Sequence, residues 1–349
     1  MSSPAAKAAS APSLMPAEWE KHEATWLAWP HNARDWPGKF AAIPWVYAEI
    51  VRRIAAGETV RVLAGGQEAA ARRVLDKAGV SLERVQFLDV PTDRVWTRDS
   101  GPIWVRRGGR RGVARFRFNG WAKYPDWKRD VRIPERAAKA MDVPLLDTGG
   151  AVLEGGAIDV NGRGSLLATE ECLLDPAVQV RNADFSQADY ERVFSQVLGA
   201  TNAIWLGRGI AGDDTHGHVD DLARFVGPRT IVLCEEKDSR DANHAPLREN
   251  RERLQSARLE DGSRPEVVAL PMPEPLSFAG QRLPASYANF YVCNAAVLVP
   301  VFDDPHDRVA LGILAELFRD RPVIGINCRD FVWGLGTLHC CTQQEPAQG

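Results

Sequence analysis

Gly149–Gly156, the stretch GGAVLEGG, lies between a predicted helix and a predicted hairpin and shows the plan on which the chain is built. The helical periodicity before it predicts a helix over 130–141, followed by a short strand. The Asn161-Gly162 pair after it is typical of a tight turn between antiparallel strands. The same order of helix, strand, glycine-containing turn and hairpin returns around 212–221. The sequence therefore predicts one structural unit that is repeated.

The spacing of the predicted helices gives the period of this repeat. Helices centre near residues 135, 192, 251 and 312, about 60 residues apart, which is typical of circular or stacked repeats. No GxGxxG follows a strand, and the predicted strands pair as hairpins, which adjacent strands of a parallel sheet cannot do. We therefore predict an α/β fold in which five units, each a helix with three short strands, form a ring.

The two parts of the chain differ in composition. Residues 1–13 are rich in Ala, Ser and Pro and lack the apolar segment of a signal peptide, so we expect a disordered leader. Residues 14–349 are expected to form a single catalytic domain. The six cysteines show no CxxC pair or zinc-ligand spacing, which favours reduced thiols and a cytoplasmic location. The net charge of −3 and the lack of a long apolar run argue against nucleic acid and the membrane as partners.

Residues that could carry chemistry occur at equivalent places of the repeat, where a strand meets a turn. They are three acids, one imidazole and one thiol: Asp99, Glu154, Asp220, His218 and Cys340. If the units surround an axis, these turns converge, and their carboxylates could bind a guanidinium while a thiolate attacks its carbon. His218 and Asp220, two residues apart on a predicted strand, would share one face.

Each of these residues also has a structural interpretation. Cys340 could be a small buried apolar residue, and Asp99 could form an ion pair with its neighbour Arg98. Glu154 could be a buried structural carboxylate that needs a partner. The spacing of His218 and its aspartate also suits a surface ion pair.

A metal site is the competing functional interpretation. Enough oxygen and nitrogen ligands lie in one segment of the sequence: Asp213, Asp214, His216, His218 and Asp220. No HExxH or similar spacing accompanies them, so we expect no metal. His339 adjoins Cys340, and neighbours on a strand face opposite ways, so we do not expect this histidine to act as the base for that cysteine.

Separated motifs in a fixed order resemble a known family. They are MPAEWEKHEATWLAWP at 15–30, WTRDSGP at 96–102, FNGW at 118–121, LEGG at 153–156, GDDTHGHVDD at 212–221, LPASYANFYVCNAAVLVP at 283–300 and GLGTLHCCTQQ at 334–344. Together they cover nearly the whole chain. It resembles agmatine deiminases and their porphyromonas-type peptidylarginine deiminase relatives, in the guanidino-modifying (pentein) superfamily. The resemblance implies a five-bladed α/β propeller.

The resemblance also implies roles for the candidate residues. Cys340 matches the nucleophile and His218 the general acid/base. Asp99 and Asp220 match the acids that hold the guanidinium, and Glu154 the acid beside the guanidinium and the histidine. Trp96 would line the substrate channel, and we expect Asp214 to face the far end of the substrate.

Three residues depart from the family's usual pattern. Leu335 and Thr337 stand where Gly and Asn are expected, and His216 stands where Asn or Asp is usual. We expect these departures to affect the rate and the fit of the substrate more than the type of reaction.

The implied reaction is the hydrolysis of agmatine, a small molecule, to N-carbamoylputrescine and ammonia through a covalent thiouronium on the cysteine, with no cofactor.

Two alternatives stay open: a deiminase of free or peptidyl arginine, and a binding module that holds polyamines in an acidic mouth. Nearby acids and an aromatic ring favour agmatine, since Arg98 is the one cation near the motifs and should point away from Asp99. A homodimer, and a biosynthetic or a catabolic role, are also left open.

Overall fold

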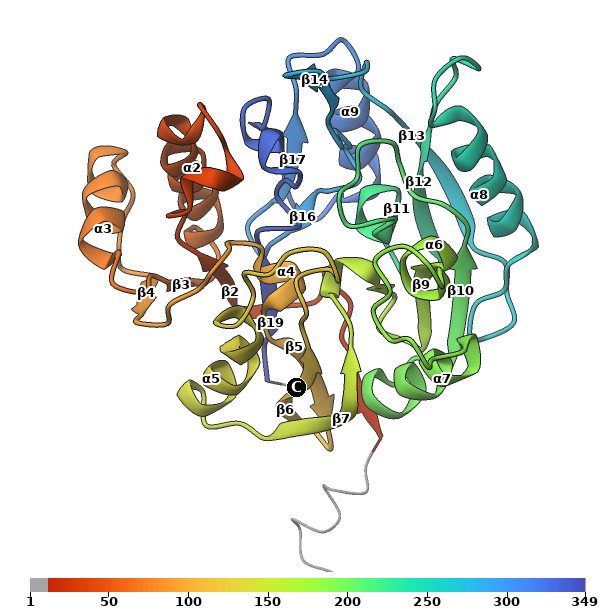
Figure 1. Cartoon of the computed structure of the whole chain (residues 1–349), viewed down its shortest axis with the longest axis horizontal. Helices are drawn as coiled ribbons and strands as arrows, with labels where there is room; N and C mark the ends of the chain where they lie inside the picture. Colours follow the sequence, from red (N-terminus) through yellow and green to blue (C-terminus); the bar gives the residue numbers. More distant parts are fainter. Residues whose placement is uncertain (1–11, 349) are drawn as a thin grey trace, which may run out of the picture.

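A computed structural model describes residues 12–348, which form an α/β fold with five sheets of three or four strands and one separate two-stranded hairpin (Figure 1). Four of the sheets follow one plan: an antiparallel hairpin, then a helix, then a third strand parallel to the middle one. A hairpin needs only a short turn, whereas a parallel strand needs a longer crossover, and the helix provides it. The predicted repeat is confirmed at this level.

The four units that follow this plan come one after another along the chain, and the separate two-stranded hairpin at 277–282 lies between the third and the fourth. Their elements are β5 (Ile103–Arg107), β6 (Arg110–Arg117), α5 (Ile133–Ala140) and β7 (Leu145–Val152); β8 (Asp159–Val160), β9 (Ser165–Thr169), α7 (Gln187–Val193) and β10 (Asn202–Leu206); β11 (Ala223–Phe225), β12 (Thr230–Glu235), α8 (His244–Ser256) and β13 (Glu266–Pro271); β16 (Tyr291–Val292), β17 (Val297–Val301), α9 (Asp307–Leu317) and β18 (Val323–Asn327).

The fifth sheet joins the two ends of the described chain. Its order is β19 (Gln343–Pro346), β2 (His22–Ala28), β3 (Thr59–Leu63) and β4 (Val85–Leu88), with α2 (Ile43–Ala55) and α3 (Glu68–Lys77) as crossovers. Periodicity did not predict β19, because its side chains are polar. They are nevertheless buried: Glu345 Oε2 accepts hydrogen bonds from Trp26 Nε1 and Arg61 Nε, both at 2.8 Å.

Two boundaries differ from the predictions. The expected leader of 1–13 is too long, because Ser13 belongs to β1 (Ser13–Leu14), pairs with Arg107 and is buried; residues 1–11 lie outside the described part of the chain. The helix predicted over 187–198 divides into α7 and the π-turn η5 (Phe194–Leu198), which ends at Gly199 with φ 70°.

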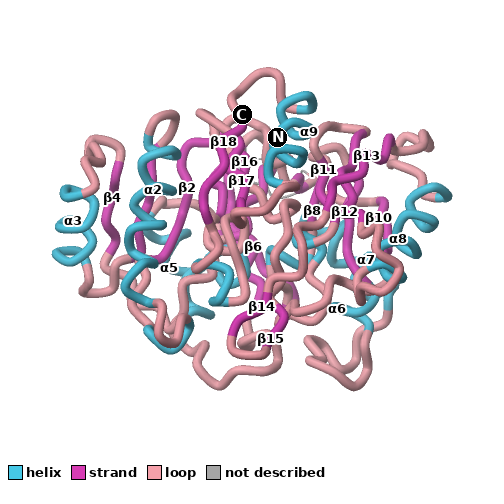
Figure 2. Tube along the Cα trace, turned by 90° about the horizontal axis from the view of Figure 1, so that it is seen from above, coloured by secondary structure: helices cyan, strands magenta, loops and turns pink. Residues whose placement is uncertain are grey.

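The hydrophobic core lies between the sheets and their helices. The larger cluster includes buried side chains of β2, α2, β12 and β17, and a second cluster lies among β5, β9 and α7. Figure 2 shows α3 and α8 at opposite margins, with the strands between them. No helix of residues 12–348 is long and apolar enough to cross a membrane.

Short helical turns hold or adjoin the candidate residues. Asp99 lies in α4 (Thr97–Ser100) and Asp220 in η6 (Val219–Asp221), whereas Glu154 and His218 directly precede η4 (Gly155–Ala157) and η6. Cys340 lies in the turn at 338–341, after η7 (Phe331–Gly334). α4 contacts η4, and η4 contacts η6, so turns from different units meet as predicted. The prediction of a strand at His218 is wrong: this residue precedes the 3-10 turn η6, and β11 begins only at Ala223. The remaining short elements are η1 (Ala33–Asp35), η2 (Phe40–Ala42), η3 (Asp130–Arg132), α6 (Glu170–Leu174), β14 (Ser277–Phe278) and β15 (Gln281–Arg282).

Candidate active site

A cavity of about 400 Å³ opens beside α4 and the segment that follows η7. Cys340, Asp99, Trp96 and Trp121 line it and are almost fully buried. Its lining carries four carboxylates and two guanidinium groups, from Asp35, Asp99, Asp126, Asp214, Arg34 and Arg94. The excess of acid suits a cationic ligand.

Cys340 presents its thiol to this cavity. Its Sγ lies 3.1 Å from Asn289 Nδ2 and 3.8 Å from Asp220 Oδ2. Burial raises the pKa of the thiol well above its usual value, and the carboxylates of Asp220, Asp221 and Asp99 raise it further. The neighbouring Cys341 is also buried but does not line the cavity, and its Sγ contacts the Leu338 carbonyl at 3.4 Å. Burial and the neighbouring carboxylates therefore favour the protonated form of the Cys340 thiol.

His218 lies among three carboxylates. Its Nδ1 is 3.7 Å from Asp99 Oδ1 and 4.0 Å from Asp220 Oδ1, and its Nε2 is 3.7 Å from Glu154 Oε2. The ring is 1% exposed, and neither nitrogen has a hydrogen-bond partner within the described chain. Burial alone would lower its pKa, but Asp99, Cys172 and Glu154 outweigh burial and raise the pKa well above the usual value. The imidazole can therefore hold a proton at neutral pH.

Asp99 faces the cavity from α4. Its Oδ2 accepts a hydrogen bond from Trp121 Nε1 at 3.0 Å, and its Oδ1 accepts one from the Gly156 amide at 3.1 Å. Burial raises its pKa to about 6, although His218 acts in the opposite direction. A Cβ at Gly156 would lie 2.5 Å from His218 Nδ1 and 2.8 Å from Asp99 Oδ1, so this close approach requires glycine.

Asp220 is positioned by a second histidine. Its Oδ2 lies 2.6 Å from His339 Nδ1, while its Oδ1 has no hydrogen-bond partner among residues 12–348. His339 Nε2 contacts Glu18 Oε2 at 2.8 Å, so a carboxylate lies at each nitrogen of this ring. His339 thus faces Asp220 and Glu18, and no hydrogen bond joins its ring to the Cys340 thiol. This placement is consistent with the expectation that His339 is not the base for Cys340.

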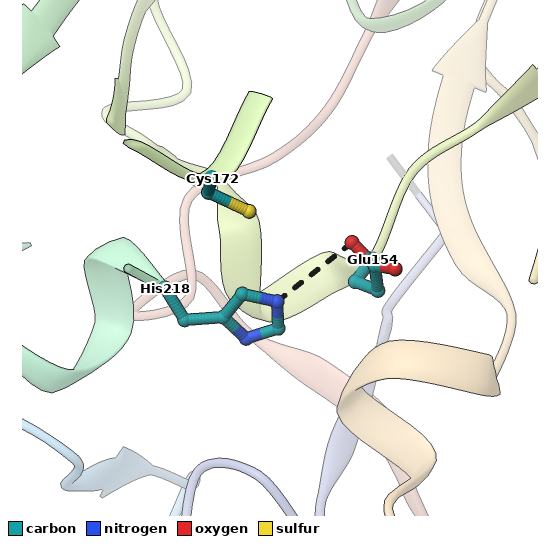
Figure 3. Close-up of side chains that lie close together, drawn as sticks. All are labelled: Glu154, Cys172 and His218. Atoms are coloured by element: carbon teal, nitrogen blue, oxygen red, sulfur yellow. Dashed lines mark ion pairs between the residues drawn. The ribbon is translucent and has the colours of Figure 1, made fainter. Parts of the chain in front are cut away.

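Glu154 has a buried partner that sequence reasoning missed. Arg181 Nε lies 3.2 Å from both carboxylate oxygens of Glu154, and both side chains are fully buried. Burial would raise the pKa of Glu154, but Arg181 and His218 lower it to about 2. Figure 3 shows Glu154 and His218 facing one another, with Cys172 beside them. Each of these three residues has one possible metal-ligand atom, and these atoms lie within 4.8 Å of one another.

Trp96 and Asp214 both line the cavity. Trp96 packs against Trp36, with ring centroids 5.5 Å apart. Asp214 Oδ2 accepts a hydrogen bond from Tyr124 Oη at 2.6 Å, and its other oxygen forms an ion pair with Lys123. The charge of Asp214 is therefore already compensated.

The cations near the cavity differ from the prediction. Arg98 points away from Asp99, as predicted, and binds Glu18 and Gln344. It is not the one cation nearby, because Arg34 and Arg94 line the cavity. The two arginines were not predicted because they lie outside the motifs.

The three departures have different structural settings. Leu335 lines the cavity with φ 67°, a conformation that favours glycine. His216 has φ 64°, which asparagine tolerates better, and its Nε2 lies 2.9 Å from Asp175 Oδ2. Thr337 donates a hydrogen bond to Asn289 Oδ1 at 2.7 Å.

The five residues weighed as a metal site are not brought together as one ligand set. Asp213 accepts hydrogen bonds from the backbone amides of Thr215, Gly217 and His218, so its oxygens serve to shape the turn. His216 faces Asp175 instead of His218. The compact groups of possible ligands in the described part of the chain are Glu154 with Cys172 and His218, and Asp220 with Asp221 and Cys340.

Comparison with known proteins identifies relatives of the whole chain. An agmatine deiminase of Stutzerimonas stutzeri is 36% identical to the chain, with 95% of both proteins covered. The structure resembles an agmatine deiminase of Enterococcus faecalis with TM-score 0.90 and 27% identity, covering 97% of both chains. It also resembles a Porphyromonas gingivalis protein described provisionally as an arginine deiminase, with TM-score 0.87 and 37% identity, covering 96% of this chain and 98% of that one. The family model described as Porphyromonas-type peptidyl-arginine deiminase matches residues 14–346, and the chain belongs to this family.

Proposed function

We propose that the protein is an agmatine deiminase, which hydrolyses agmatine to N-carbamoylputrescine and ammonia. One observation carries the proposal: a cavity lined by carboxylates ends at the Cys340 thiol, with the buried imidazole of His218 just behind Asp99. A thiol beside carboxylates is a poor nucleophile without a cation, and a guanidinium supplies that cation. The names of the S. stutzeri and E. faecalis relatives support the choice of agmatine.

Binding of the guanidinium prepares the nucleophile. Asp99 and Asp220 each present carboxylate oxygen to the space beside Cys340 Sγ, and such oxygens bind guanidinium N–H groups in its plane. The positive charge of the substrate then favours loss of the Cys340 proton. Glu154, held by Arg181, stays ionised beside His218 and maintains its protonated form.

The reaction then proceeds in two stages. The Cys340 thiolate attacks the central carbon of the guanidinium, and the tetrahedral adduct expels ammonia after His218 gives it a proton. This leaves a thiouronium on Cys340. His218, now neutral, takes a proton from water, and the resulting hydroxide adds to the same carbon. The second adduct expels the Cys340 sulfur, which takes up the proton of the new hydroxyl group, and the neutral ureido product is released, so the steps need no cofactor.

The far end of the cavity distinguishes agmatine from arginine. A site for arginine should offer a free cation to the α-carboxylate. Arg94 is not free in this sense, because it donates to Asp35 at 3.0 Å and to Asp126 at 2.9 Å. The aromatic rings of Trp96, Trp121 and Tyr124, which line the cavity, suit the lone ammonium of agmatine better. Arg34, which is largely exposed, is the cation that keeps free arginine open as the alternative.

Ammonia release from the purified protein tests this function. We expect kcat/KM for agmatine to exceed that for free arginine, and for a peptide containing arginine, by at least about a hundredfold, the order expected when a charged group enters unpaired. The Cys340→Ser variant is the control for contaminating activity. Comparable kcat/KM on arginine would overturn the assignment of agmatine as the substrate. Saturable binding of agmatine without ammonia release would indicate a binding module.

The five sheets support a wider proposal about the architecture. Four of them share one strand plan, and β19 completes the fifth sheet by pairing antiparallel with β2, so we propose that the units surround one axis as a five-bladed propeller. The six free cysteines support a reducing, cytoplasmic location.

A further inference from the structure

Asn289, from the segment before β16, contacts the proposed nucleophile directly. Its Nδ2 lies 3.1 Å from Cys340 Sγ and 3.0 Å from Asp221 Oδ1, and its side chain is fully buried. Sequence reasoning included this residue in the LPASYANFYVCN motif but gave it no role. Asparagine carries two N–H donors, and these two contacts occupy both of them.

The other end of the amide fixes its orientation. Oδ1 accepts hydrogen bonds from Thr337 Oγ1 at 2.7 Å, from the His339 amide at 3.1 Å and from the Cys340 amide at 3.4 Å. Since all three are donors, the oxygen must face the loop that holds Cys340, and the NH₂ group must face the thiol. The hydroxyl of Thr337, a departure from the family pattern, contributes to this orientation.

The surroundings of Sγ make such a donor important. The charged neighbours of the thiol are carboxylates, with Asp220 Oδ2 at 3.8 Å, and they oppose the formation of a thiolate. Within the described part of the chain, Asn289 is the side chain that places an N–H group within hydrogen-bond distance of Cys340 Sγ. The backbone of Thr337 also forms a hydrogen bond with this sulfur. The same amide also accommodates the thiol form, because its Oδ1 lies 3.5 Å from Sγ.

We propose that Asn289 is a catalytic residue that stabilises the Cys340 thiolate by donating its Nδ2–H to the sulfur. The inference rests on the proposed function for its place in the reaction, but the hydrogen bond itself acts in the free protein. It acts before the guanidinium is attacked and again when the thiolate leaves the second adduct. The purely structural alternative is that Asn289 only holds the loop.

The pH dependence of Cys340 alkylation by iodoacetamide separates these two roles without using turnover. The rate is measured at each pH by mass spectrometry of the peptide that contains Cys340. Asn289→Asp keeps the acceptor for the loop but loses the donor, and Asn289→Leu has a similar size without adding a charge. Thr337→Val weakens the loop contact and keeps the donor. Asn294→Asp is the matched control, since this asparagine binds the backbone of His22 and Gly57 away from the cavity.

We expect both Asn289 variants to move the alkylation midpoint upward by about one to two pH units, the size of a hydrogen bond to a charged group. Their kcat for agmatine should fall about 10²-fold or more. The Thr337→Val and Asn294→Asp midpoints should stay within about half a unit of the wild type. Three results would overturn the proposal. The first is a shift in Asn289→Asp but not in Asn289→Leu, which would reflect only the added charge. The others are an unchanged midpoint in both Asn289 variants, and a shift of equal size in Thr337→Val. If the wild type alkylates as expected but releases no ammonia from agmatine, the proposed function fails while the hydrogen bond stands.

Discussion

Arg181 Nε lies 3.2 Å from both carboxylate oxygens of Glu154, and neither side chain is exposed. The guanidinium also donates to the Thr215 carbonyl at 2.6 Å and to the Gln179 carbonyl at 2.9 Å. Glu154 is thus a carboxylate with a fixed partner on one side and the imidazole of His218 on the other. This arrangement explains how an ionised acid can stay buried beside the proposed general acid/base.

Replacing Arg181 by methionine should therefore destabilise the fold. Removing one partner of a buried ion pair leaves an uncompensated charge and lowers the free energy of unfolding by about 3–5 kcal/mol. Urea denaturation at neutral pH measures this. Arg192→Met is the matched control, because Arg192 pairs with Asp189 at the surface of α7 and such pairs contribute about 0–1 kcal/mol. Equal losses in the two variants would show that the Glu154 pair is unimportant.

The same pair predicts a loss of stability in acid. The folded pKa of Glu154, about 2, lies below its usual value of 4.5. Its contribution is therefore fully present above pH 4.5 and is lost as the pH falls from 4.5 toward 2. Glu154→Gln should flatten this part of the curve of unfolding free energy against pH. If the unfolding free energy of Glu154→Gln falls in acid as steeply as that of the wild type, Glu154 is not the source of the loss of stability.

The two adjacent cysteines should behave differently. Cys340 lines the cavity, whereas Cys341 lies behind it against the Leu338 carbonyl. Cys340→Ser should lose nearly all turnover, and Cys341→Ser should keep most of it. Rapid quench with mass spectrometry should find the covalent adduct on the peptide at Cys340 only; an adduct on Cys341, or equal loss of turnover in both variants, would reject the assignment.

The two histidines of the GDDTHGHVDD segment should also differ. His218→Asn should lower kcat by about 10²–10⁴-fold with substrate binding largely kept. His216→Asn should be mild, because His216 pairs with Asp175 away from His218 and its φ of 64° suits asparagine. Steady-state kinetics of both variants decide between them. An essential His216 would mean that the motif is placed wrongly.

The repeat and the convergence of the turns could be predicted because they depend on local periodicity and on turn residues. The residues that contact Glu154 and Cys340 and influence their charges could not be predicted. Arg181 pairs with Glu154 across 27 residues, and Asn289 reaches Cys340 across 51. Such pairs depend on how separate units meet, which no local pattern encodes. The strand β19 was missed for a related reason. It is polar, so the alternation of apolar residues is absent, and its buried Glu345 depends on ion pairs with Arg61 and Arg111.

Leu335 should be a strained residue at the cavity wall. Its φ of 67° is unfavourable for leucine by about 1–2 kcal/mol, and glycine adopts it freely. Leu335→Gly should change the unfolding free energy little or raise it by up to about 1 kcal/mol, since the relief of strain is offset by the flexibility of glycine in the unfolded chain. It should also widen the cavity and change KM for agmatine more than kcat. A loss of stability greater than about 2 kcal/mol, as from an emptied core position, would show that the packing of Leu335 outweighs its strain.

The last prediction concerns the acid limb of the pH–rate profile. Asp99 must be ionised to bind the guanidinium, and burial raises its pKa from 3.8 to about 6, so kcat/KM should fall as the pH drops below about 6. For stability the sign is opposite: the folded pKa lies above the unfolded value, so the contribution of Asp99 is present below pH 3.8 and lost as the pH rises through about 6.

The indole of Trp121 provides the test of this assignment. Its N–H donates to Asp99 at 3.0 Å and favours the ionised carboxylate. Trp121→Phe should therefore move the acid limb of kcat/KM upward by about half to one pH unit, the value of one hydrogen bond. Trp205→Phe is the control, because Trp205 also donates to a carboxylate, that of Glu191, but does not line the cavity. A limb that stays in place in Trp121→Phe would show that a group other than Asp99 governs it; Asp35, whose pKa burial also raises to about 6, would then be the residue to replace.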